Sequence, residues 1–93
     1  MKIDHRGQEY VHLPVTGAPA DSATPDVTFD DGNEWHPTTW NADRTSVSIL
    51  VAGPDMPNPA GVVLPIGRHL PVVRLIDSPE TLIRTAAGTV DIV

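Results

Sequence analysis

The sequence contains no cysteine, so neither a disulfide framework nor a thiolate metal site can form. Its longest apolar runs cover only a few residues, far fewer than a membrane-spanning helix requires. Met1 to Gly7 has no apolar segment of the kind that secretory signals carry, so we expect synthesis in a cytoplasm. Stability must therefore come from packing within a small core, or from packing shared with a partner.

Basic residues are also few, because six Lys and Arg stand against twelve Asp and Glu, which gives a formal net charge of -6. Proteins that bind nucleic acid irrespective of its sequence need clustered cations to neutralise phosphates. The charge balance therefore disfavours direct nucleic-acid binding, and it disfavours anionic membranes as well. The length of 93 residues suits one domain with one core.

The distribution of prolines and glycines favours an all-β fold. Ten prolines and seven glycines are spread along the chain, and no window shows the apolar spacing of a helix over three turns. Short segments that alternate apolar and polar residues recur between turn residues, as is typical of all-β proteins. About seven strands are predicted, at residues 9–15, 25–30, 34–40, 46–52, 61–66, 69–77 and 81–93, the last interrupted at 86–88. Residues 1–93 form a single domain in this interpretation, with residues 1–8 as a flexible or docking arm.

The clearest of these strands is 46–52, where Val47, Ile49 and Val51 are predicted to face inward. The segments 16–24 and 53–60 are rich in turn residues and prolines, so they are predicted to be loops. Trp35 and Trp40 are five residues apart and fall on opposite faces of a regular strand. One of the two, with Trp35 as the structural candidate, should therefore fill the core.

The longest apolar-rich stretch, residues 61–77, reads GVVLPIGRHLPVVRLID. Its first part resembles the corner of immunoglobulin-like sandwiches, where a glycine turns the chain and a ring residue two places later begins a strand in the opposite sheet. Gly67 would make the turn, and a ring nitrogen of His69 would bond to upstream backbone, as a tyrosine hydroxyl does in that corner. This corner predicts an immunoglobulin-like β-sandwich. The alternative is a plain hairpin, in which Gly67 supplies the positive φ of the loop.

The same stretch predicts an exposed apolar strip. If His69, Val73 and Leu75 face the core, alternation places every second residue on the opposite face. The residues on that face are Leu70, Val72, Arg74 and Ile76. A small sandwich has no helix to cover them, so we predict that they contact another protein. Met56 of residues 53–60, which we call the proline loop, is predicted to belong to the same contact. The alternative is that the arm or the proline loop of the same chain folds over the strip.

No catalytic, cofactor or metal motif is visible. His36 lies near Asp30, Asp31 and Glu34, but the ligand spacing of known metal sites is missing, and the two aspartates also suit a turn. None of the serines has the glycine-flanked elbow of hydrolases. We therefore expect a non-enzymatic protein without a cofactor or a metal.

Four segments carry a resemblance to a known group of proteins: DGNEWHPTTW, SVSILVAGPDMPNPAG, LPIGRHLPVVRLIDSPE and IRTAAGTVDIV. They resemble small virion proteins encoded among the structural genes of tailed phages of actinobacteria, over most of residues 30–93. The resemblance implies an assembled component with an immunoglobulin-like or small barrel fold: a capsid-surface or minor capsid protein, a head-to-tail connector piece or a tail-associated module. It also implies location in the virion, other virion proteins as partners and a homo-oligomer in the particle.

A different class of function remains open beside this one. A free-standing β-sandwich module could bind sugars through an exposed aromatic platform. With four aromatic residues in the chain and at least two needed for the core, the platform would consist of Trp40 and Tyr10.

Overall fold

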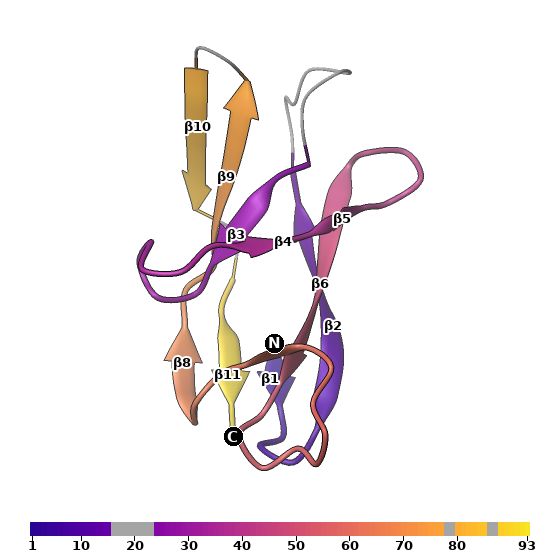
Figure 1. Cartoon of the computed structure of the whole chain (residues 1–93), viewed down its shortest axis with the longest axis vertical. Helices are drawn as coiled ribbons and strands as arrows, with labels where there is room; N and C mark the ends of the chain where they lie inside the picture. Colours follow the sequence, from indigo (N-terminus) through magenta and orange to yellow (C-terminus); the bar gives the residue numbers. More distant parts are fainter. Residues whose placement is uncertain (16–23, 78–79, 86–87) are drawn as a thin grey trace.

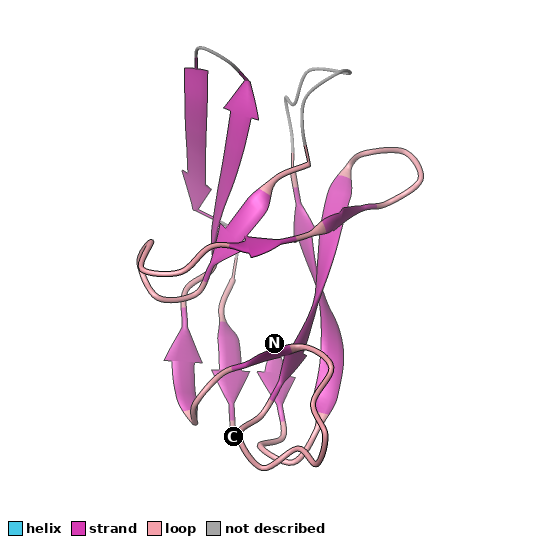
Figure 2. Cartoon of the chain, in the orientation of Figure 1, coloured by secondary structure: helices cyan, strands magenta, loops and turns pink. Residues whose placement is uncertain are grey.

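The computed structural model describes residues 1–15, 24–77, 80–85 and 88–93. Within these ranges the chain forms strands, turns and loops, and no helix is present (Figure 2). The predicted all-β fold class is therefore confirmed. In the described part of the chain there is also no helix able to cross a membrane.

The described strands group into three small sheets (Figure 1). The terminal sheet has the order β1 (Lys2–Ile3), β11 (Val90–Ile92) and β8 (Gly67–His69). The hairpin sheet has the order β10 (Glu80–Thr85), β9 (Val72–Asp77), β3 (Asp26–Thr28) and β4 (His36–Pro37). The long sheet has the order β2 (Gln8–Pro14), β6 (Ser46–Ala52) and β5 (Thr39–Trp40), and β7 (Val62–Val63) also pairs with β6.

The longest ladder joins β2 and β6, which run antiparallel from the pair Gln8–Ala52 to the pair Pro14–Ser46. Alternation along β6 buries Val47, Ile49 and Val51, as the sequence predicts, and the predicted bounds 46–52 are confirmed. The segment 16–24 is predicted to be a loop, and all of it except residue 24 lies outside the described ranges.

Three of the predicted strands are wrong because the chain changes sheet within each of them. Residues 34–40 divide into β4 and β5, which belong to the hairpin sheet and the long sheet. Between them the Thr38 hydroxyl donates a hydrogen bond to the Pro25 carbonyl oxygen at 2.6 Å, which fixes the crossing. Residues 69–77 divide in the same way at Leu70 and Pro71, and residues 81–93 divide into β10 and β11.

The chain also changes sheet at Gly67. Before this residue β7 pairs with β6, and from it onward β8 pairs with β11, so the segment is a corner between two sheets and not a hairpin. Gly67 has a φ of 136°, a conformation that favours glycine. His69 Nε2 donates a hydrogen bond to the Pro65 carbonyl oxygen at 2.8 Å, which is the upstream backbone contact that the corner interpretation predicts.

Residues 1–8 are predicted to be a flexible or docking arm, and in the structure they dock onto the body of their own chain. β1 pairs parallel with β11, and the Ile3 side chain between them is completely buried. The His5 amide donates a hydrogen bond to the Val93 carbonyl oxygen at 2.7 Å. The backbone of Gly53 lies so close to His5 that a Cβ atom there would overlap the His5 carbonyl group. This segment is therefore an integral edge of the terminal sheet.

All three sheets contribute side chains to one hydrophobic core. Its buried members are Ile3, Val11, Leu13, Val27, Phe29, Val47, Ile49, Val51, Leu64, Val73, Val90 and Ile92. Trp40 packs against this cluster and is partly buried, so it is the one of the two tryptophans that reaches the core.

Candidate interaction surfaces

The outer face of the hairpin sheet carries the predicted apolar strip. Along β9, Val73 and Leu75 are only 3 % and 4 % exposed, whereas Ile76 is 47 % exposed. On β10, Ile83 is opposite Arg74 in the register and is 50 % exposed. We call the surface formed by Val72, Arg74, Ile76 and Ile83 the outer strip.

Two of the predicted interface residues lie elsewhere. Leu70 is 61 % exposed, but it precedes β9 and is separated from it by the buried Pro71. Met56 belongs to the proline loop, which Figure 1 shows at the end of the molecule opposite the β9–β10 hairpin. The structure therefore brings together Val72, Arg74 and Ile76 and leaves Leu70 and Met56 outside this surface.

Arg74 is the one charged residue of the outer strip, and its charge is compensated within the chain. Its Nη2 donates a hydrogen bond to Asp26 Oδ2 at 2.9 Å. The guanidinium carbon lies 4.2 Å from the centre of the Trp35 ring, in cation–π geometry. Only 28 % of the Arg74 side chain is exposed, so a partner that covered it would displace little additional water.

Trp35 reaches the outer strip because of a tight turn between β3 and β4. Asp31 and Gly32 have φ values of 59° and 89°, as two central residues of a type I′ turn do, and the Asn33 amide donates to the Asp30 carbonyl oxygen. The predicted turn at this position is confirmed. The chain beyond this turn places Trp35 over Arg74, so of the two tryptophans Trp40 packs against the core and Trp35, the structural candidate, does not.

Side-chain hydrogen bonds hold this turn together. The Thr28 hydroxyl donates to Asp30 Oδ1 at 2.7 Å, and the same carboxylate oxygen accepts the Glu34 amide at 3.0 Å. The hydroxyl oxygen in turn accepts the Gly32 amide at 3.0 Å. The hydrogen bond from Thr28, followed by that from the Glu34 amide, lowers the pKa of Asp30 below its ordinary value of 3.8.

A small apolar pocket of about 220 Å³ opens beside the outer strip. Its lining consists of Thr28, Asp31, Gly32, Trp35, Val72 and Ile83. A pocket of this size, framed by an aromatic ring and two branched aliphatic side chains, can accept one large apolar side chain of a partner. The sequence did not reveal this pocket, because it joins residues up to 55 positions apart through the pairing of β3, β9 and β10.

Neither of the chain's own segments that could have covered the outer strip does so. Residues 1–8 pair with β11 in the terminal sheet. The proline loop is tied to that same segment, since the Asp55 amide donates to the His5 carbonyl oxygen and the Ala60 amide donates to Gln8 Oε1, both at 2.9 Å. Both segments lie at the far end from the hairpin in Figure 1.

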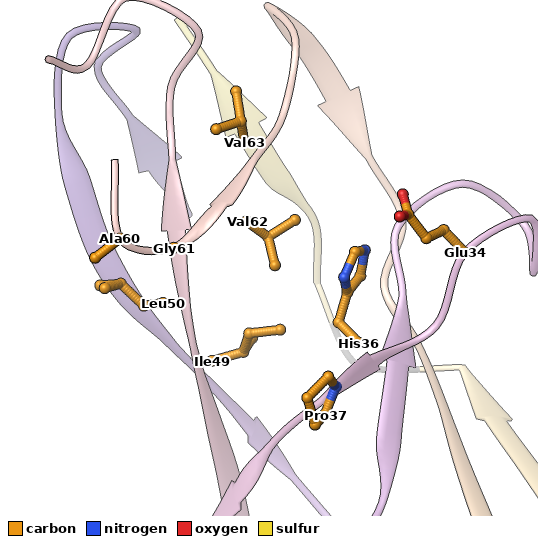
Figure 3. Close-up of a pocket in the computed structure, with 9 residues that line it drawn as sticks. All are labelled: Glu34, His36, Pro37, Ile49, Leu50, Ala60, Gly61, Val62 and Val63. Carbon is orange, nitrogen blue, oxygen red and sulfur yellow. The ribbon is translucent and has the colours of Figure 1, made fainter. Parts of the chain in front are cut away.

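A second depression, of about 460 Å³, lies between β4 and β7. It opens above the part of β6 that lies between the stretches paired with β5 and β7. Figure 3 shows His36 and Glu34 on one side of the opening and Val62 on the other. Among the described residues, no group of three or more potential ligands for a metal ion exists.

The two residues of the predicted sugar platform lie apart. Trp40 pairs with Val47 in the register and shares its inward face, whereas Tyr10 pairs with Leu50 on the opposite face of the long sheet. The guanidinium of Arg44 stacks over the Trp40 ring at 4.8 Å. The long sheet therefore separates the two rings, and they cannot form one continuous platform.

Comparisons of this chain with protein-family models, with curated proteins and with solved structures find no match. Function must therefore be inferred from the surfaces described above. Among them, the outer strip combines two half-exposed isoleucines, an adjacent apolar pocket and a cation that is already paired, which are features of a protein contact surface.

Proposed function

We propose that this chain is a non-enzymatic structural protein of a phage virion, a capsid-surface or minor capsid protein or a head-to-tail connector component. It docks onto other virion subunits, and the outer strip is the docking surface. The observation that carries this proposal is the apolar face of β9 and β10, where Ile76 and Ile83 are 47 % and 50 % exposed and neither residues 1–8 nor the proline loop covers them. The virion as the setting comes from the resemblance of residues 30–93 to phage structural proteins.

The proposed fold is an immunoglobulin-like β-sandwich. Its support is the corner at Gly67, where the chain passes from the long sheet to the terminal sheet and His69 bonds back to the Pro65 carbonyl. A core to which several sheets contribute agrees with it as well. In such a fold, function resides in the surfaces that meet neighbouring subunits.

Physical chemistry favours the outer strip as a contact. Ile76 and Ile83 each leave about half of their surface in water, and covering the remainder contributes roughly 1 kcal/mol for each side chain. The pocket beside Trp35 adds a place for one anchoring side chain from the partner. Arg74 needs no new counter-charge when it is covered, because Asp26 already supplies one.

Recovery of the chain from particles tests the virion assignment directly. Phage particles from the source of this sequence are purified on a density gradient, and their peptides are quantified by mass spectrometry. We expect peptides of this chain at a fixed ratio to the major capsid protein through successive purification steps. Loss of the chain from infectious particles, with the ratio falling at each step, would overturn the assignment.

A pair of substitutions tests the docking surface. Ile76→Asp places a charge on the outer strip at an exposed position, so we expect normal folding and at least about tenfold lower incorporation into particles when the variant replaces the native protein. Ile66→Asp is the matched control, because Ile66 is 63 % exposed and lies outside the outer strip. Equal incorporation of both variants would show that the outer strip is not the contact.

The alternative, a sugar-binding module, has less support. It needs a platform of stacked rings, and the long sheet separates Tyr10 from Trp40. The depression at His36 could admit part of a ligand, although its lining includes no tryptophan or tyrosine. Titration with a panel of oligosaccharides, monitored by tryptophan fluorescence, distinguishes the two classes, since the virion proposal predicts no saturable change.

A further inference from the structure

β10 is a six-residue edge strand whose second edge pairs with no described strand. It is the last strand of the hairpin sheet and pairs only with β9, from Glu80–Asp77 to Thr85–Val72. β3 pairs with β9 only as far as Arg74, so the paired residues 75–77 of β9 and 80–82 of β10 extend beyond β3 (Figure 1). A long exposed edge of this kind is a template for pairing with another strand.

The charges of β10 are arranged so that the strand complements itself. Glu80 and Arg84 lie four positions apart, so their side chains are on the same face of the strand with Leu82 halfway between them. Both are exposed, and neither forms a salt bridge with another residue in the described part of the chain. One Arg84 nitrogen reaches only the carbonyl oxygen of Ile83, at 3.3 Å.

Antiparallel pairing of two identical strands allows few registers over six residues. Residues directly opposite each other must share a face. The two-fold axis therefore lies midway between the two copies of one residue, so that this residue is opposite its own equivalent. With the axis at Leu82, Glu80 of each copy is opposite Arg84 of the other, and Leu82 is opposite its own equivalent. With the axis at Ile83, Arg84 would be opposite Leu82 and no opposite charges would meet.

We infer that a second copy of this chain pairs with β10, antiparallel and in the register centred on Leu82. Two Glu80–Arg84 ion pairs then flank the Leu82 contact, and the two hairpin sheets join into one sheet of eight strands. On the opposite face, Ile83 of one copy is beside Thr81 of the other. The outer strips of both copies therefore become a single apolar surface across the two-fold axis.

The other long edge of the described structure lacks these properties. β2 pairs only with β6 and is also terminal in its sheet, but it contains Pro14, which cannot donate a backbone hydrogen bond, and a single charged carboxylate at Glu9. Centred on Val11, β2 would place Glu9 opposite Leu13. Self-pairing at β2 would therefore gain no opposite-charge contact, whereas β10 would gain two.

Charge reversal tests both the strand and its register. Sedimentation velocity of the full chain over micromolar to millimolar concentration should show reversible dimerisation. Glu80→Arg and Arg84→Glu each place like charges opposite one another twice per dimer, so each variant should dimerise about tenfold or more weakly. An equimolar mixture of the two variants should form a heterodimer of near-native affinity, because every opposing pair is then of opposite charge. The double variant E80R/R84E should also recover dimerisation.

Three outcomes would overturn the inference: a wild-type chain that stays monomeric throughout, single reversals that dimerise like wild type, or a mixture that does not recover. Pairing of β10 with a strand of a different protein would appear as the first outcome. The inference rests on the proposed role in assembly and adds a second copy of the chain as a partner. The β10 pairing and the virion assignment are nevertheless tested by different experiments. A monomeric chain recovered from virions would leave the outer strip proposal intact, and a dimer absent from virions would leave the β10 pairing intact.

Discussion

At the scale of single residues, the turn at Asp30 determines the shape of the surface beside the outer strip. Thr28 is 1 % exposed, and its hydroxyl joins the Asp30 carboxylate to the backbone of the turn. Through this turn Trp35 lies over Arg74 and forms one wall of the apolar pocket. The Asp30 carboxylate thus helps to shape the surface proposed for docking, although it is not itself part of the outer strip.

This carboxylate should make the turn sensitive to acid. Because folding lowers the pKa of Asp30, its contribution to stability is present above its ordinary value of 3.8 and is lost as the pH falls through the lower value of the folded state. We expect the urea midpoint of the wild type to fall between about pH 5 and pH 2 by more than that of Asp30→Asn, which has no charge to lose. Asp31→Asn is the control, since the hydrogen bonds from Thr28 and Glu34 go to the Asp30 carboxylate and not to that of Asp31. Identical acid profiles for wild type and Asp30→Asn would contradict the role of this carboxylate.

At the scale of elements, the first strand shows how two residues can be integral to a fold. β1 has only Lys2 and Ile3, yet it closes the terminal sheet and buries Ile3 against the core. The proline loop is then fixed by backbone hydrogen bonds from Gly53 and Asp55 to the residues that follow β1. The beginning of the chain, the end of the chain and the proline loop therefore form one connected unit.

Removing the buried side chain of β1 should therefore be costly. Ile3→Ala should reduce the free energy of unfolding by about 2–4 kcal/mol, because the cavity cannot collapse fully between β11 and the core. Lys2→Ala on the exposed face of the same strand should change it by less than about 0.5 kcal/mol. Urea unfolding monitored by tryptophan fluorescence gives both values. Equal stability of the two variants would mean that residues 1–8 behave as a flexible arm and not as an edge of the terminal sheet.

Sequence reasoning succeeds for elements whose signal is local. Alternation identified β6 with its bounds, and it assigned the faces of Val73, Leu75 and Ile76 correctly although β8 and β9 are separate strands. The turn at Asp31 followed from the tolerance of Asp-Gly for positive φ. What alternation cannot show is which sheet a strand joins, since a crossing such as that at Thr38 leaves the local pattern intact.

The candidate site likewise contains residues that a local pattern predicts and residues that it does not. The three strip residues on β9 could be predicted because one strand carries them. Trp35, Ile83 and the pocket could not, since they depend on a turn that redirects the chain and on pairing between distant strands. The place of Met56 was missed for a similar reason, because the proline loop is positioned by residues of the first eight.

At the scale of the whole molecule, order should decrease from β6 in the long sheet to β10 at the edge of the hairpin sheet. β6 is flanked by strands along most of both edges and contributes three core residues, while β10 pairs along one edge and is exposed at five of its six residues. Backbone segments with few buried contacts open at low free energy, so they exchange amide protons quickly. A partner strand at the free edge of β10 would remove that difference.

Native-state hydrogen exchange in dilute protein should show this gradient. We expect the slowest amide of β10 to exchange at least about tenfold faster than the slowest amide of β6, because β10 can open without disturbing the core. Raising the concentration should slow exchange in β10 and leave β6 unchanged, since a second copy covers only the free edge. The Glu80→Arg variant serves as control and should show fast β10 exchange at every concentration. Uniform protection of β6 and β10 in dilute protein would mean that the hairpin unfolds only with the whole molecule, without a separate low-energy opening.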